Sequence, residues 1–100
     1  MMTITKSREN TAMNLILEGR LDTTTAPQLE EALKEGMDGV TALAMDMGKL
    51  EYVSSAGLRV LLAAQKKMNA VNGTMVLRNV CEDIKEVFEI TGFCDILTVE

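Results

Sequence analysis

The stretch VTALAMDM, residues 40–47, is apolar at every position except Thr41 and Asp46. A strand with this composition is buried on both faces, which is typical of a sheet covered by helices. Residues 74–77 predict a second central strand. Because helical segments alternate with these strands, the sequence predicts a small α/β sandwich with parallel pairing through its centre and helices covering the sheet.

A hairpin is predicted upstream of this core. Met13, Leu15 and Leu17 alternate with Asn14, Ile16 and Glu18, and residues 3–8 show a weaker alternation. Glu9 and Asn10 join the two segments. Alternation with a period of two indicates strands with one face exposed, so we expect an antiparallel pair at the sheet edge.

Three helices have recognisable ends. Residues 25–28, TAPQ, have the spacing of a capping box with the proline in the first turn, and Asn79 with Glu82 offers a second start of this kind. The helix that follows the paired serines is expected to run to about Val71. Gly92 is expected to end the third helix.

Composition excludes several classes of function. The net charge is −5 and the chain has only three aromatic residues, so it lacks the basic surface and the stacking platform of nucleic-acid-binding proteins. It has no histidine, which excludes a Ser-His-Asp triad and any zinc site that uses histidine. We therefore expect no nucleic-acid partner, no metal and no cofactor.

The sequence predicts a cytoplasmic location. Arg59 interrupts the longest apolar stretch, so we expect no membrane span, and we see no signal peptide. Cys81 and Cys94 have no CxxC spacing. We expect both thiols to be reduced and buried as small apolar side chains.

The strand at residues 40–47 is expected to be followed by a loop at residues 48–53 and then by a helix. The segment LEYVSSAGLRVLL, residues 50–62, places Ser54 and Ser55 where this loop meets the helix. Ligands and chemistry collect at this edge of open α/β sheets. Serine is also a preferred N-cap, so either residue could serve only to bond a free N–H group of the first turn. A nucleophile is the second interpretation, but the segment matches neither GxSxG nor SxxK.

Phosphorylation is the third interpretation of the serines. A phosphate at a helix amino end meets free N–H groups and the positive end of the helix dipole, so the fold should tolerate it. Its added charge would then act on a partner surface. Gly57 would leave room for another backbone, and Arg59 is a long polar arm close to the serines.

Two stretches resemble one known family. LEYVSSAGLRVLL, after the strand ending MDMGKL, resembles the signature of the STAS domain of bacterial anti-sigma factor antagonists, and GRLDTTTAPQLEEAL resembles the family's other well-kept stretch. The resemblance covers residues 1–100 as a single domain. It implies a mixed, mostly parallel sheet of four to five strands covered by about four helices.

The resemblance implies a non-enzymatic partner switch. The unphosphorylated protein would bind an anti-sigma factor that is also a serine kinase and so free a sigma factor. The kinase would phosphorylate the antagonist, and a metal-dependent serine phosphatase would reverse the modification. We expect a monomer between binding events. An alternative is a scaffold or sensor module of another partner-switching pathway, in which the serines are structural.

Carried onto this chain, the resemblance makes Ser55 the phosphate acceptor, with Ser54 as the alternative. Many members have an aspartate before the acceptor and a serine or threonine after it, where this chain has Ser54 and Ala56. Asp22 matches the acidic position beside the acceptor. The expected partner-binding residues are Asp22, Thr23, Thr24, Ser54, Ala56, Gly57, Leu58 and Arg59.

Overall fold

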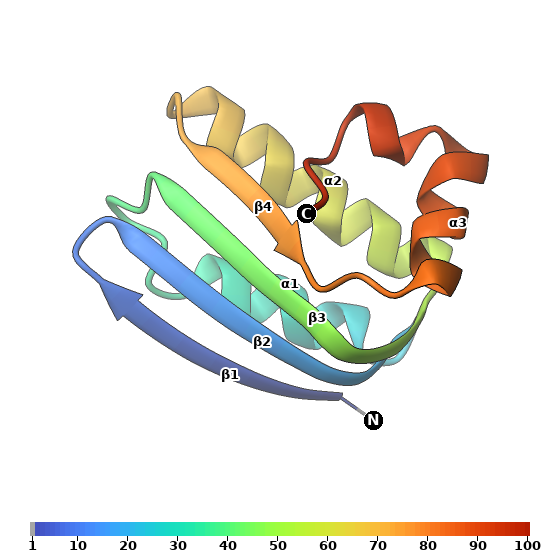
Figure 1. Ribbon diagram of the computed structural model, residues 1–100. Coiled ribbons are helices and arrows are strands. Elements are labelled where there is room, and N and C mark those ends of the chain that lie inside the picture. Colours follow the sequence, from blue (N-terminus) through green and yellow to red (C-terminus); the bar gives the residue numbers. More distant parts are fainter. Residues whose placement is uncertain (1) are drawn as a thin grey trace.

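The computed structural model describes residues 2–100 and shows a four-stranded mixed sheet in the order β1-β2-β3-β4 (Figure 1). The elements are β1 (Met2–Glu9), β2 (Ala12–Leu21), α1 (Ala26–Lys34), β3 (Ala42–Val53), α2 (Ser55–Ala70), β4 (Thr74–Arg78), α3 (Glu82–Thr91) and a short 3-10 helix (Phe93–Asp95). This confirms the predicted α/β class. Residue 1, the first of the predicted domain, lies outside the described residues.

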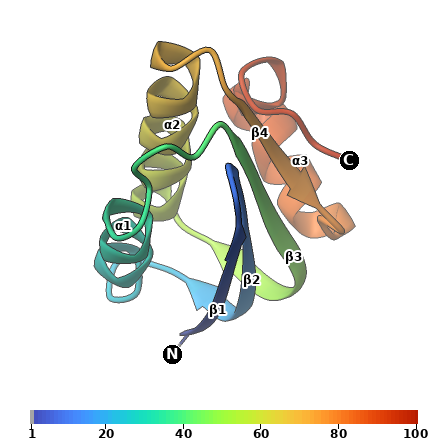
Figure 2. The same cartoon turned by 90° about the vertical axis from the view of Figure 1, so that its left-hand side faces the viewer.

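Helices cover both faces of the sheet (Figure 2). Helices α1 and α2 lie side by side on one face, and α3 lies on the other (Figures 1 and 2). Leu15 of β2, Met45 of β3 and Leu77 of β4 are fully buried, as is Leu61 of α2. Each such side chain stabilises the fold by about 1.5–3 kcal/mol through burial. No helix within residues 2–100 is long and apolar enough to cross a membrane.

The predicted amino-terminal hairpin is confirmed. Strands β1 and β2 pair antiparallel from Met2 opposite Gly19 to Glu9 opposite Ala12. Asn10 lies in the turn with φ = 57°, a left-handed conformation that asparagine tolerates better than most residues. β1 forms one edge of the sheet, and parallel pairing of β2 with β3 and of β3 with β4 follows.

Strand β3 is longer than predicted. Residues 48–53, which we expected to form a loop, continue the strand and pair with β2 as far as Leu21 opposite Val53. The register shifts twice along this pairing, and each shift adds a residue to β3. The carboxylate of Asp46 accepts a hydrogen bond from the Gly48 N–H at 2.9 Å. Two β-bulges thus accommodate Gly48 and its neighbours, and the strand continues past them.

Strand β4 is an edge strand, so the prediction that it is central was wrong. After α3 and the 3-10 helix, only residues 98–100 return to the sheet, where they make an isolated parallel bridge between Leu77 and Val99. The N–H of Leu77 donates to the carbonyl of Thr98 at 2.9 Å, and the N–H of Glu100 donates to the carbonyl of Leu77 at 2.8 Å. The end of the chain therefore covers part of this edge.

Gly92 ends α3 in the left-handed conformation, as expected. The two predicted capping boxes at the helix starts were wrong. Thr25 precedes α1 without a side-chain capping bond, because its hydroxyl donates to the Arg20 carbonyl at 2.7 Å. Cys81 precedes α3, again without such a bond. The side chain of Asn79 instead donates to Asp46 at 3.2 Å.

The prediction that both cysteines are buried was also wrong. Cys81 and Cys94 are both free and exposed, not buried. Cys81 lies just before α3 and Cys94 lies within the 3-10 helix, so both belong to surface segments. Their apolar neighbours Ile84 and Phe88 fill the core on this side of the sheet.

Two basic side chains of β1 donate hydrogen bonds to carbonyls at the end of α1 and just after it. These contacts were not predicted from the sequence. Lys6 donates to the carbonyls of Ala32 at 3.2 Å and Glu35 at 2.8 Å. Arg8 donates to the carbonyls of Gly36 and Asp38, both at 2.6 Å. The last carbonyls of a helix lack partners within the helix and favour cations, so these contacts stabilise the turn that leads to β3.

Candidate functional site

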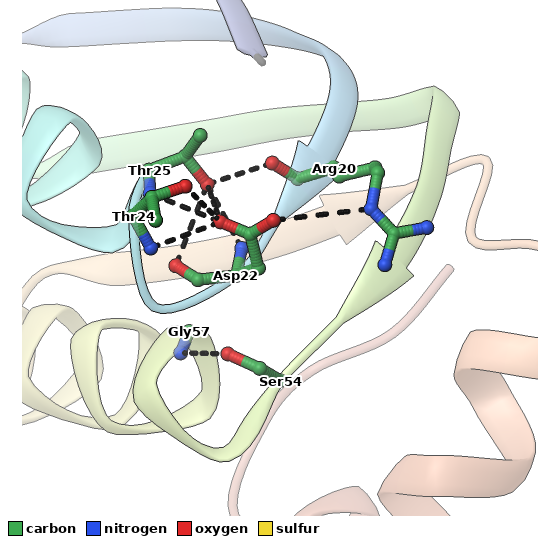
Figure 3. A network of polar contacts seen from close by, with 6 residues as sticks. All are labelled: Arg20, Asp22, Thr24, Thr25, Ser54 and Gly57. Atoms are coloured by element: carbon green, nitrogen blue, oxygen red, sulfur yellow. Dashed lines mark hydrogen bonds and ion pairs between the residues drawn. The ribbon is translucent and has the colours of Figure 1, made fainter.

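The loop after β2 and the start of α2 lie next to each other at the carboxyl ends of β2 and β3 (Figure 3). Leu21 and Val53 are paired at the ends of the parallel strands β2 and β3, and the Ser54 N–H donates to the Leu21 carbonyl at 2.8 Å. The loop residues Asp22, Thr23 and Thr24 therefore lie beside the serines. The structure brings together the two stretches that sequence analysis singled out.

Asp22 organises its own loop. One carboxylate oxygen accepts hydrogen bonds from the Thr24 hydroxyl at 2.7 Å and from the N–H groups of Thr24 at 3.0 Å and Thr25 at 3.1 Å (Figure 3). The Thr24 hydroxyl is the main reason that the pKa of Asp22 lies below its ordinary value, while partial desolvation acts in the opposite direction. Asp22 is thus ionised and held in one orientation beside the serines.

The Thr24→Val substitution is expected to raise the pKa of Asp22 towards the ordinary value of about 3.9, because it removes the hydroxyl that stabilises the carboxylate. A lowered pKa in the folded state stabilises the fold above the unfolded pKa, and this stabilisation is lost as pH falls through the folded value. The stability of the Thr24→Val protein should therefore fall less steeply than that of wild type as the pH is lowered below about 4. An NMR titration of the carboxyl group measures the shift.

Thr23→Val is the matched control for this titration. Thr23 is exposed in the same loop, and the hydrogen bonds that orient the Asp22 carboxylate come from Thr24 and Thr25. The control should leave the Asp22 midpoint in place. Equal midpoints for wild type and Thr24→Val would contradict the assignment.

The two serines differ in position. Ser54 is the N-cap of α2, and its hydroxyl oxygen accepts a hydrogen bond from the Gly57 N–H at 3.3 Å (Figure 3). Ser55 is the first residue of α2 and is exposed. The capping interpretation is therefore confirmed for Ser54, and Ser55 is the more accessible of the two residues.

The Ser54→Ala substitution should lower the free energy of unfolding by about 1 kcal/mol, since it removes an N-cap side chain. Ser55→Ala should change that energy by less than about 0.5 kcal/mol, because its side chain is exposed. Urea denaturation of both variants makes the comparison. Equal losses would contradict the assignment of the cap to Ser54.

Gly57 and Leu58 are buried. A Cβ atom at position 57 would lie 2.6 Å from Cγ of Leu21 and 3.1 Å from the Leu21 carbonyl oxygen. This corrects the prediction that Gly57 leaves room for the backbone of another protein, because the space is filled by Leu21 of the same chain. Among the expected partner-binding residues, Gly57 and Leu58 shape the helix start from within.

The remaining residues of the expected partner surface are accessible. Thr23 and Arg59 are exposed, and Ala56 is half-buried. All three border a groove of about 380 Å³ between α1 and α2. Within residues 2–100, no group of three or more Cys, Asp or Glu side chains is placed to hold a metal ion.

A contact between Arg20 and Tyr52 was not predicted from the sequence. The guanidinium of Arg20 lies 4.4 Å from the ring centroid of Tyr52, and its Nε is 3.8 Å from the carboxylate of Asp22. Arg20 and Tyr52 are neighbours in the β2–β3 register. The signal for this contact lies in the strand pairing, where a bulge sets the register, and so it could not be read from local spacing.

The sequence matches a known domain family. A model of the STAS domain matches residues 3–100. BtrV of Bordetella bronchiseptica, named as a candidate anti-sigma factor antagonist, is 37% identical over 99 residues, which cover 98% of this chain and 85% of BtrV. The anti-sigma-B factor antagonist of Listeria monocytogenes is 31% identical over 100 residues, with 95% and 84% covered.

The fold is shared with the anti-sigma factor antagonist SpoIIAA. Its unphosphorylated form gives a TM-score of 0.79 at 18% identity and covers 98% of this chain and 87% of SpoIIAA. Its phosphorylated form from Bacillus gives 0.77 at 19% identity, with 98% and 91% covered. The mixed four-stranded sheet covered by helices on both faces thus has the architecture of a STAS domain. The chain belongs to the STAS-domain family of anti-sigma factor antagonists.

Proposed function

We propose that this protein is a phosphorylation-controlled, non-enzymatic binding module. In its unphosphorylated form it binds an anti-sigma factor that is also a serine kinase, and a sigma factor is freed. The kinase transfers a phosphate to the hydroxyl of Ser55, and the phosphorylated protein leaves. A metal-dependent serine phosphatase restores the binding form. The protein acts as a monomer in the cytoplasm, where ATP is available to the kinase.

The observation that carries this proposal is the difference between Ser54 and Ser55. The Ser54 oxygen faces into the helix and accepts the Gly57 N–H, whereas Ser55 is exposed at the first position of α2. A kinase needs an accessible hydroxyl, and Ser55 supplies one on a rigid element. These contacts favour Ser55 over Ser54 as the acceptor.

The local electrostatics explain why a phosphate would act on the partner. A phosphate on Ser55 would meet the free N–H groups of the first turn and the positive end of the α2 dipole, so the fold tolerates it. Arg59 lies one turn further along the helix, where i and i+4 side chains are neighbours. The ionised Asp22 lies in the adjacent loop, so a phosphate on Ser55 adds negative charge near an existing carboxylate and would repel an acidic partner surface.

The relatives support the choice of partner. The Listeria protein is named an anti-sigma-B factor antagonist, and SpoIIAA has been solved in both unphosphorylated and phosphorylated forms. A chain of the same family that displays a serine in this way is suited to the same kind of switch.

A pull-down from a lysate of the source organism tests the proposal, with wild type, Ser55→Ala and Ser55→Asp as baits. Wild type and Ser55→Ala should recover the same ATP-binding serine kinase, and Ser55→Asp should not. Circular dichroism of each bait should show an unchanged fold. Recovery of the same partners by all three baits would indicate a scaffold with structural serines.

A further inference from the structure

The groove between α1 and α2 is apolar inside. The two helices lie side by side on the same face of the sheet (Figure 2). The groove of about 380 Å³ is lined by Leu33 of α1 and by Val60 and Ala63 of α2, among others. Leu33 and Val60 are buried at the base of the groove and Ala63 is exposed at its side, so the inner lining is apolar.

Basic side chains form the rim of this groove. Arg59 and Lys67 of α2 and Lys34 of α1 border it, and all three are exposed. Glu30 also borders it, but its carboxylate lies 3.5 Å from the Lys34 ammonium. The sequence has no acidic residue between Glu51 and Glu82, although the whole chain has a net charge of −5. The rim is therefore a positive surface on an acidic protein, which selects for a negative partner.

The groove begins next to the proposed phosphorylation site. Thr23 and Ala56 border the end of the groove that lies at the start of α2, and Ala56 follows Ser55 directly. From Ala56 to Lys67 the α2 side of the groove is about 16 Å long, which matches roughly three turns of a second helix. Grooves between helices commonly accept the apolar face of an amphipathic helix.

We propose that this groove binds an amphipathic helix with acidic flanks, supplied by the anti-sigma factor kinase. Apolar side chains of that helix enter between α1 and α2, and its carboxylates face Arg59 and Lys67. This inference rests on the proposed function and adds the part of the surface that holds the partner. It also connects binding to the switch, because a phosphate on Ser55 competes for Arg59 and repels the acidic flanks.

A synthetic peptide tests the groove without the kinase. The probe is an amphipathic helical peptide with leucines on one face and flanking glutamates, titrated into the isotope-labelled full chain and followed by NMR. Amide shifts should gather on α1 and on α2 between Ala56 and Lys67. Lys67→Glu should weaken binding by about tenfold, and Lys66→Glu by less than about twofold.

Lys66→Glu is a close control, because Lys66 is exposed on the same helix, carries the same charge and lies outside the groove lining. A peptide with lysines in place of the glutamates should bind more weakly than the acidic one. The proposal is overturned if the acidic peptide causes no shifts on α1 and α2, if both peptides bind equally, or if both variants weaken binding equally. None of these outcomes depends on whether Ser55 is phosphorylated, so they leave the proposed function to its own test.

Discussion

The Gly57→Val substitution is expected to lower the free energy of unfolding by about 3 kcal/mol, because its Cβ would overlap Leu21. Leu21 is fully buried at the end of β2, and its carbonyl accepts the Ser54 N–H. Any shift of Leu21 would therefore also move the serine pair. By helix propensity alone the change would be neutral or slightly favourable, since valine is a better helix former than glycine. Urea denaturation measures the loss.

Ala63→Val is the matched control, because it introduces the same side chain at an exposed position of the same helix. Its cost should stay below about 1 kcal/mol. A Gly57→Val protein as stable as the Ala63→Val protein would show that Leu21 yields easily. The account of Gly57 as a contact residue for Leu21 would then be wrong.

The Ser55→Asp substitution should weaken binding of the kinase by about 50-fold, because it places a fixed negative charge on the partner surface. The fold should be unaffected, since an acidic side chain in the first turn of a helix is favoured by the helix dipole. Isothermal titration calorimetry with the kinase recovered in the pull-down measures the affinity.

Ser54→Asp adds the same charge one residue earlier and is the sharpest control. Aspartate is a good N-cap, so its carboxylate should take the place of the Ser54 oxygen and accept the Gly57 N–H. We therefore expect its effect on affinity to be below about fivefold. If Ser54→Asp matched or exceeded Ser55→Asp, the acceptor would be better placed at Ser54.

Much of the fold could be predicted because it depends on local patterns. The hairpin follows from alternation around Asn10, and the end of α3 follows from Gly92. Residues 48–53 were misassigned because Gly48 favours a turn, whereas pairing with β2 makes the segment a strand. The capping box before α1 failed for a similar reason, since the Thr25 hydroxyl donates to the carbonyl of Arg20 in β2 and makes no capping bond to the helix.

The sequence predicted the roles of single residues in the site better than the contacts between residues that are distant in the sequence. Serine is a preferred N-cap, so the role of Ser54 followed from residue type, and the position of Asp22 beside the serines followed from the resemblance. The contact between Arg20 and Tyr52 depends on a register set by bulges, and the buried state of Gly57 depends on Leu21. Such features arise from tertiary packing, which short sequence motifs do not encode.

The most direct test of the account is to locate the phosphate. Trypsin cleaves after Lys49 and Arg59 and releases residues 50–59, LEYVSSAGLR, which contain both serines. The purified protein is incubated with the captured kinase and Mg-ATP, digested, and fragmented between positions 54 and 55 in a mass spectrometer. We expect one phosphate, carried by Ser55. A phosphate on Ser54, or a peptide that stays unmodified while the kinase is active, would contradict it.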